Sequence, residues 1–283
     1  MRSALVLAGG GYVASSWEIG LITGMAEAGV DVRNADLFVG TSAGARVALD
    51  LTSGMALDEI YQRRAGTEMP ALDRPAMVDW ARLKAGVDAA KQTGGSPAEI
   101  LRRCGALALT FAVGTGSDRR KVVASQLPLQ VWPKQRVLIT AVCAETGERR
   151  AFDRDSGIDL VDAIIATTAS FGSPPMLFEG DHYIDGGYHS GDNADLAIGF
   201  ERVLILSLRP PPNAMRLVPL DPAVEALRAA GAQVEVIHPD EDTLAALVET
   251  GGPMNPASGR SAAIVGRLQG QRSANERIGS FWR

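Results

Sequence analysis

The sequence predicts one α/β domain of three layers, with helices on both faces of a central, mostly parallel sheet. Short apolar strands alternate with helical patterns from the first residues onward, and two glycine-rich turns each follow a strand and precede a helix. The chain has 283 residues, with no internal repeat and no low-complexity tract. We therefore expect a single domain over residues 1–283.

The alternation is clearest in residues 1–55. Ala4–Ala8 is a continuous apolar run, typical of a strand that is buried on both faces of a parallel sheet. A helical pattern over Trp17–Ala28 follows, with Ser15 or Ser16 in front of it, and a second strand is predicted at Asp36–Gly40. The residues after that strand are again helical, which completes two strand–turn–helix units.

The middle of the chain, residues 57–133, contains no predicted strand. It holds several helical pieces, one of which begins with a capping box at Ser96–Glu99. We expect these helices to flank the sheet, and the alternative is a helical cap over the active face. The other predicted strands are Arg136–Val142, Arg149–Phe152, Tyr183–Ile184, Val203–Leu208 and Gln233–Ile237. The other predicted helices are Asp159–Ser170, Ala223–Ala230, Thr243–Glu249 and one after Ser258.

Composition and charge exclude several classes of protein. The formal net charge is −5 and the pI is near 5.3, so we expect no nucleic-acid partner. The longest uncharged run, residues 163–178, has 16 residues, fewer than the ~20 that a membrane-spanning helix needs. The apolar start of the chain ends at Ala8, which is too short for a signal peptide. A cytoplasmic location is therefore expected.

Cysteines, tryptophans and basic clusters suggest no further site. Cys104 and Cys143 are expected to be inert core thiols, because two cysteines form neither a disulfide framework nor a metal-binding pattern. The four tryptophans share no amphipathic stripe, so no membrane anchor is expected, and transient contact with a membrane surface stays open. The basic clusters are predicted to be solvated faces, and they are Arg102–Arg103, Arg119–Lys121 and Arg149–Arg150.

A G-T-S-A-G motif occupies Gly40, Thr41, Ser42, Ala43 and Gly44, between a predicted strand and a predicted helix. This is the context of a nucleophile elbow, in which a serine occupies the tip of a tight, strained turn. The two glycines leave space for the returning chain, and the N-terminus of the helix favours negative charge on the serine oxygen. The motif predicts a nucleophile, and a structural turn and a phosphate-binding turn are the alternatives.

Three consecutive glycines, Gly9, Gly10 and Gly11, follow the first predicted strand. Such a run can direct backbone N–H groups into one concavity that holds an anion, and in an acyl hydrolase this concavity is the oxyanion hole. The spacing of Gly9, Gly11 and Ala14 also fits a dinucleotide-binding turn. That alternative expects an acidic residue at the end of the second strand, where Gly40 stands, and is therefore disfavoured.

A third glycine turn, D-G-G, is formed by Asp185, Gly186 and Gly187 after the predicted strand H-Y-I. By itself this tripeptide predicts only a turn. Together with the other two glycine turns, it predicts a carboxylate at a sharp bend, accessible to a group on the other side of a cleft.

In this order and at this spacing, the three motifs resemble those of the patatin-like phospholipase family. Its members carry a glycine-rich oxyanion loop after the first strand, a G-x-S-x-G elbow and a D-G-G or D-G-A motif. The segment Thr168–Pro175 is also similar to the helix end and proline turn of the family. The resemblance covers residues 1–55 and about 160–190.

The resemblance implies a serine acyl hydrolase that cleaves lipid or other carboxylic esters with a Ser–Asp dyad. Ser42 would attack the ester carbonyl, Asp185 would accept its proton, and the N–H groups of Gly10 and Gly11, beside Gly9, would hold the oxyanion. Water activated through Asp185 would then clear the acyl-enzyme. An ordinary aspartate has a pKa of about 3.9, so the site must raise that pKa or couple proton transfer to the attack.

One departure from the family pattern concerns the first loop. The family usually reads G-G-G-x-R-G, whereas Val13 replaces the basic residue here and Ala14 replaces the last glycine. The backbone donors remain. The departure motivates a second hypothesis, a patatin-like protein that binds a lipid or acyl ligand without turnover. A nucleotide-binding oxidoreductase that uses the glycine loop is a third.

A Ser-His-Asp hydrolase is the main rival mechanism, and the chain has three histidines. His238 is its candidate, because it follows a predicted strand and comes after Asp185, as the order Ser, Asp, His requires. His182 and His189 flank the D-G-G motif and are expected at the surface or behind the site. No group of His, Cys, Asp and Glu has the spacing of a metal site, and we expect no metal and no cofactor.

Overall fold

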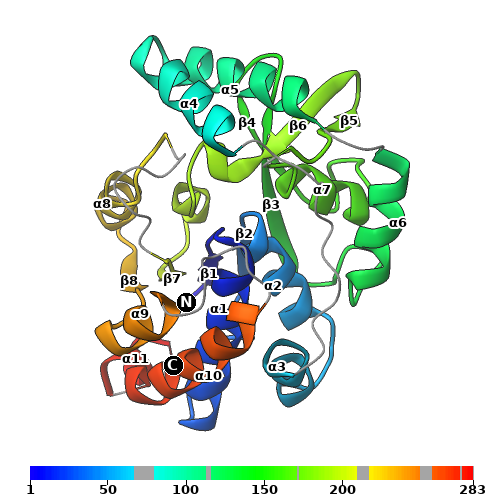
Figure 1. Ribbon diagram of the computed structural model, residues 1–283. Coiled ribbons are helices and arrows are strands. Elements are labelled where there is room, and N and C mark those ends of the chain that lie inside the picture. Colours follow the sequence, from blue (N-terminus) through cyan, green and yellow to red (C-terminus); the bar gives the residue numbers. More distant parts are fainter. Residues whose placement is uncertain are drawn as a thin grey trace.

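A central β-sheet with helices on both faces organises the chain (Figure 1). The computed structural model describes residues 1–66, 80–112, 116–170, 172–208, 217–248, 257–274 and 276–282. The strands are β1 (Ser3–Leu7), β2 (Leu37–Gly40), β3 (Arg136–Cys143), β4 (Arg149–Phe152), β5 (Met176–Phe178), β6 (Asp181–Asp185), β7 (Arg202–Leu206) and β8 (Gln233–Ile237).

The helices carry the labels of Figure 1. The first six are α1 (Gly11–Glu27), α2 (Ala43–Thr52), α3 (Leu57–Ala65), α4 (Trp80–Gln92), α5 (Pro97–Phe111) and α6 (Gly116–Gln126). The others are α7 (Leu160–Thr167), α8 (Asp221–Ala229), α9 (Glu241–Val248), α10 (Ala257–Ser273) and α11 (Glu276–Trp282), with short 3₁₀ turns η1 (Gly186–Tyr188) and η2 (Ala194–Ala197). Within the described ranges, no helix is both long enough and apolar enough to cross a membrane.

The sheet is mixed and mostly parallel. Its order is β5-β6-β3-β2-β1-β7-β8, and β4 also pairs with β3. The five strands from β3 to β8 in this order run parallel, and the pairs β3–β4, β3–β6 and β5–β6 are antiparallel. The strand order reverses at β1, which has β2 on one side and β7 on the other, and ligands of open α/β sheets bind at such a point.

Three strands pair with β3, and their arrangement on its two edges positions the site. Ile139 pairs with Gly40 of β2 and with Phe152 of β4, so β2 and β4 lie on opposite edges. Ala141 pairs with β4 and with Asp185 of β6, so β6 also lies opposite β4. Strands β2 and β6 therefore occupy the same edge end to end. Because β6 is antiparallel to β3 while β2 is parallel, the last residues of both strands approach each other.

The sheet is buried on both faces at β1, which explains why this central strand is almost entirely apolar. All five residues of β1 are buried. Leu5 and Leu7 point into a core with α1, α2, α7 and α10, whereas Ala4 and Val6 face a second core with η2 and α8. Helices α4 and α5 pack with the ends of β3 and β6 through a third cluster. The predicted α/β fold with a mostly parallel sheet is confirmed.

Most of the predicted elements are present, with some changes in their bounds. Helix α1 begins at Gly11, before the predicted start at Trp17, and Gly10 is its N-cap residue. Ser15 lies inside the helix, where its hydroxyl donates to the Tyr12 carbonyl. The capping box at Ser96 is formed. Strand β5 was not predicted. In the described part of 57–133 every regular element is helical, and residues 67–79 and 113–115 lie outside the description, as does Glu249.

Helices α1 and α10 lie side by side and touch through their backbones (Figure 1). A Cβ atom added to Gly20 would lie 2.9 Å from the Arg267 nitrogen, and one added to Gly24 would lie 2.8 Å from the Gln271 nitrogen. From the other side, a Cβ on Gly270 would meet the Met25 nitrogen at 2.9 Å. Glycines on both helices therefore permit this close contact, and α1 is buried almost all round.

The contact predicts an unusual response to a glycine-to-alanine change. Ala usually stabilises a helix by about 1 kcal/mol relative to Gly. In Gly24→Ala the new methyl group meets backbone atoms of α10, so we expect the free energy of unfolding to fall by about 1–3 kcal/mol. Gly86→Ala in α4 is the matched control, because the atoms nearest to its new methyl group belong to the Leu107 side chain, which can rotate. Urea unfolding compares the two, and equal stability would contradict the prediction.

Candidate active site

Ser42 lies at a strained turn between β2 and α2. Its φ is 52° and its ψ is −114°, and a positive φ is unfavourable for a residue with a side chain. The predicted glycines make the turn possible. A Cβ on Gly40 would lie 2.8 Å from the Ala45 nitrogen, and one on Gly44 would lie 2.8 Å from the Ala8 carbonyl oxygen. The turn thus has the geometry of a nucleophile elbow, with the hydroxyl partly exposed.

Asp185 is the partner of the Ser42 hydroxyl. The Ser42 Oγ donates to Asp185 Oδ2 at 2.7 Å, and the other carboxylate oxygen, Oδ1, accepts from the Gly187 N–H at 2.7 Å. Asp185 is 6% exposed, so little water competes for these contacts. A hydroxyl bonded to a carboxylate in such surroundings can transfer its proton as the oxygen attacks. The two residues come together because β2 and β6 share one edge of β3.

The backbone amides of both residues are held by one segment of the chain. The Ser42 N–H donates to Thr167 Oγ1 at 2.8 Å, at the end of α7. The Asp185 N–H donates to the Ala169 carbonyl at 3.1 Å, two residues further on. Thr167 was not singled out in the sequence, because a threonine at a helix end carries no signal of its own.

A buried polar cluster lies beneath the turn. The Asn193 side-chain amide donates to Thr41 Oγ1 at 3.0 Å, Thr140 Oγ1 at 3.2 Å and the Ser190 carbonyl at 2.7 Å. The two threonine hydroxyls are 3.0 Å apart. Gly186 packs on this cluster, since a Cβ there would lie 2.6 Å from the Thr140 carbonyl. The cluster ties β2, β3 and the D-G-G turn together, and sequence reasoning included only Thr41 and Gly186 of it.

The glycine loop lies directly beside Ser42. A Cβ on Gly9 would be 3.2 Å from the Ser42 Cβ, and Gly11, with a φ of 70°, opens α1. The Gly9 N–H donates to the Gly191 carbonyl at 2.8 Å. No described residue accepts from the N–H of Gly10 or Gly11. As the first donors of a long helix, these two amides can bind a developing negative charge.

A fully buried carboxyl group supports the loop from behind. Glu18 on α1 has an exposed fraction of 0%, and its Oε1 accepts from the N–H of Ala8, the residue before the loop, at 2.9 Å. In the described part of the chain, its Oε2 has no hydrogen-bond partner. Burial raises the pKa of Glu18 well above its ordinary value, and the charge of Asp192 acts in the same direction. The protonated form is therefore favoured.

The contacts described for the three histidine rings are with groups other than the Ser42 hydroxyl. The His238 Nδ1 lies 2.7 Å from the Ser207 carbonyl oxygen, at the end of β8. Three strand spacings separate β8 from β2, roughly 14 Å at ~4.8 Å each. The His182 ring contacts Glu145, and the His189 ring contacts Asn193, where burial lowers the pKa of His189. The geometry favours the carboxylate of Asp185 over any of the three as the partner of Ser42.

The dinucleotide alternative lacks its acidic residue. Strand β2 ends in Gly40 and leads directly into the Ser42 turn. Asp36 lies just before the first residue of that strand, at the end far from the Ser42 turn. Its Oδ2 accepts from the Ser3 N–H at 2.7 Å. The residues at the end of β2 and in the turn after it, Gly40, Thr41 and Ser42, include no acidic side chain of the kind that binds a ribose in that fold.

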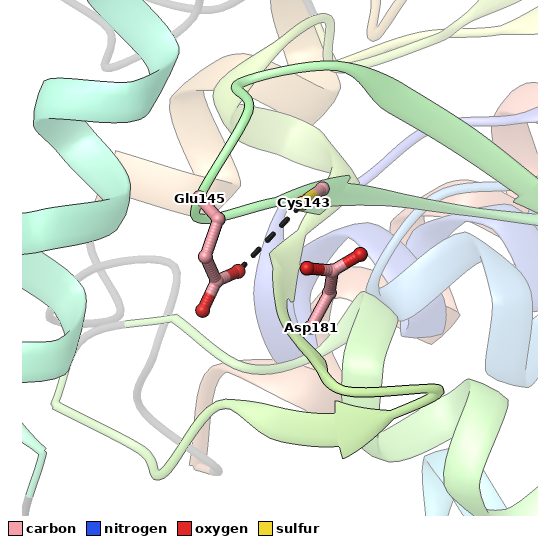
Figure 2. Close-up of side chains that lie close together, drawn as sticks. All are labelled: Cys143, Glu145 and Asp181. Carbon is pink, nitrogen blue, oxygen red and sulfur yellow. Dashed lines mark hydrogen bonds between the residues drawn. The ribbon is translucent and has the colours of Figure 1, made fainter.

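A cluster of metal-ligating residues does form, although not at a sequence spacing that predicts it. Figure 2 shows Cys143, Glu145 and Asp181, whose ligand atoms lie within 4.8 Å of one another. Glu145 is already engaged, because its Oε1 contacts the His182 ring at 2.7 Å and its Oε2 accepts from the His182 N–H at 2.9 Å. These contacts engage both carboxylate oxygens of Glu145. Both cysteines are buried, as expected. The Cys143 thiol contacts Glu145, and burial raises the pKa of the Cys104 thiol.

The buried Glu18 predicts a pH dependence of stability. Its ordinary pKa is about 4.5 and its folded pKa is higher, so unfolding releases a proton and stability falls as pH rises through the folded pKa. Glu18→Gln keeps the acceptor for Ala8 but does not ionise. We therefore expect the variant to gain stability relative to the wild type as the pH is raised from about 5 to about 9.

Urea unfolding over this pH range measures the effect, and Glu27→Gln on the same helix is the control. A hydrogen bond from Arg267 lowers the pKa of Glu27, so Glu27→Gln should be less stable than the wild type by an amount that stays constant above pH ~4.5. A stability difference between Glu18→Gln and the wild type that does not change with pH would contradict the prediction.

Comparisons with known proteins identify relatives of the chain. The family model described as patatin-like phospholipase matches residues 5–198. The crystal structure of the type III effector protein ExoU matches with a TM-score of 0.46 and 16% identity, over 98% of this chain and 53% of that chain. VipD from Legionella pneumophila matches with a TM-score of 0.40 and 13% identity, over 88% and 54%.

The structure of SpcU in complex with ExoU from the type III secretion system of Pseudomonas aeruginosa matches with a TM-score of 0.38 and 16% identity, over 96% and 52%. The chain thus spans about half the length of the solved structures that it matches. The search of curated proteins found no similar sequence.

Proposed function

The chain belongs to the patatin-like phospholipase family, and on that premise we propose that it is a serine hydrolase that cleaves carboxylic esters of lipids through a Ser42–Asp185 dyad. The observation that carries the proposal is the 2.7 Å hydrogen bond from the Ser42 hydroxyl to Asp185 at the tip of a strained turn. The family supports a lipid substrate, and the dyad needs neither a metal nor a cofactor.

In the first half-reaction, the Ser42 Oγ attacks the ester carbonyl carbon while its proton moves to Asp185 Oδ2. The carbonyl oxygen becomes an oxyanion, and the N–H groups of Gly10 and Gly11 stabilise it at the N-terminus of α1. Collapse of this intermediate breaks the bond to the alcohol, which leaves with the proton from Asp185. The acyl group remains on Ser42 as an ester.

In the second half-reaction, a water molecule replaces the alcohol. Asp185 accepts a proton from the water as its oxygen attacks the acyl carbon, and the same amides hold the new oxyanion. Collapse releases the carboxylic acid, and the Ser42 oxygen takes the proton back. The Gly187 N–H, which holds Asp185 Oδ1, keeps the other oxygen directed at Ser42 throughout.

The second candidate is a protein that binds an acyl ligand without turnover. It is favoured by Val13, which stands where the family has a basic residue and is 5% exposed within the core. The loop in this chain is instead held by the Gly9–Gly191 bond and by Glu18. These contacts supply the fixed loop that catalysis requires, so we place hydrolysis first.

Three variants test the dyad. We expect Ser42→Ala and Asp185→Asn to lower the hydrolysis of a short-chain nitrophenyl ester by about 10³-fold or more, because each removes one half of a unit. His238→Ala should leave the rate within about twofold, since its ring contacts Ser207. A fluorophosphonate probe should label Ser42, as located by mass spectrometry.

The outcomes separate the hypotheses. Activity that is lost in His238→Ala but kept in Asp185→Asn rejects the dyad in favour of a triad. Labelling of Ser42 without ester hydrolysis supports an acyl-binding protein. Absence of both, together with tight NAD binding, supports the oxidoreductase.

A further inference from the structure

The end of α7 holds the backbone of both proposed catalytic residues. Thr167 Oγ1 accepts the Ser42 N–H at 2.8 Å, and the Ala169 carbonyl accepts the Asp185 N–H at 3.1 Å. These two contacts come from the same short segment. A shift of that segment would therefore move the serine and the aspartate relative to each other and to the glycine loop.

This segment is fixed by a buried guanidinium group. Arg119 on α6 is 5% exposed, which contradicts the expectation of a solvated face at this basic cluster. Its Nη1 donates to the carbonyls of Ile165 at 3.1 Å and Pro174 at 3.2 Å. Its Nη2 donates to the carbonyl and to the hydroxyl oxygen of Thr168, both at 2.9 Å.

The chemistry of arginine suits this position. The last carbonyls of a helix lack partners within the helix and carry partial negative charge. A planar guanidinium has five donors in a fixed arrangement, so one group can hold three carbonyl groups and a hydroxyl at once. A lysine ammonium at the same place would be a single point and could not span Ile165, Thr168 and Pro174 together.

We propose that Arg119 is a positioning residue for the Ser42–Asp185 pair, because its guanidinium locks the end of α7 that holds the amides of both. This inference rests on the proposed hydrolase activity. The acceptors described for Arg119 belong to Ile165, Thr168 and Pro174 and not to the reacting residues. Its effect passes through Thr167 and Ala169, which are the residues directly before and after its acceptor Thr168.

The neighbouring arginine provides a matched control. Arg120 is on the same helix and contacts the same partner helix, but its side chain is 45% exposed and it binds Asp159 and Asp162 at the start of α7. The two residues therefore bind opposite ends of α7. Loss of Arg120 removes two ion pairs of an exposed arginine, which contribute little, whereas loss of Arg119 removes the donor to three carbonyl groups.

The test is steady-state hydrolysis of a nitrophenyl ester by Arg119→Ala, Arg119→Lys and Arg120→Ala. A misplacement of about 1 Å can cost about 10²-fold in rate, so we expect kcat of Arg119→Ala to fall by about 10²-fold with KM within about twofold. Arg119→Lys should be intermediate, Arg120→Ala should match the wild type, and added guanidinium ion should partly restore Arg119→Ala.

Amide hydrogen exchange gives a readout that needs no activity. In Arg119→Ala, and not in Arg120→Ala, the amides of Ser42 and Asp185 should exchange faster than in the wild type. If Arg119→Ala does not fold, Arg119→Lys is judged by the same two measurements. The proposal is overturned if the Arg119 variant that folds keeps the wild-type kcat and exchange rates, or if Arg120→Ala is affected equally.

The two proposals can fail separately. A wild-type protein that hydrolyses no ester and is not labelled at Ser42 contradicts the proposed function, and the exchange rates then still decide the role of Arg119. An active wild type with an unaffected Arg119 variant contradicts only the present inference.

Discussion

The pairing of β3 is the constraint on which the candidate site depends. One edge of this strand carries β4, and the other carries β2 and β6 in succession. Strands β2 and β6 run toward each other along that edge. The turn after β2 therefore lies next to the last residue of β6. The Ser42 turn leaves one strand and Asp185 ends the other, so the register of a single strand sets the distance between the two side chains.

The remaining parts of the site are held from behind by buried contacts. The Gly9–Gly191 bond joins the glycine loop to the segment after the D-G-G turn. In that segment, Asn193 joins Thr41, which follows β2, to Thr140 of β3. Each of these partners is buried, and a buried hydrogen bond is costly to break without a substitute. The loop, the elbow and the D-G-G turn therefore form one rigid unit, as a preorganised site requires.

The sequence singles out the residues of the three glycine turns and gives no signal for the residues that pack beneath them. Ser42, Asp185 and the glycines stand out because close backbone contacts at strand ends demand Gly at fixed spacings. Thr167, Asn193 and Arg119 have no such signature, because their roles depend on which elements pack together in space. The basic cluster Arg119–Lys121 shows this, since Arg119 is buried and its neighbour Arg120 is exposed on the same helix. For the fold, the parallel strands were predictable from their apolar runs, whereas the short β5 was missed because it has three residues, none of them buried.

The glycine contact between α1 and α10 links the site to a part of the chain beyond the family match, which ends at residue 198. Helix α1 starts at Gly11, at the end of the glycine loop, and α10 packs against the backbone of that helix at Gly20 and Gly24. A graft of residues 5–198 onto another scaffold would bring every motif residue but would leave a bare strip of α1 peptide groups in water. A minimal engineered version of this site must therefore include α10, or fill the strip by replacing Gly20 and Gly24 with larger side chains.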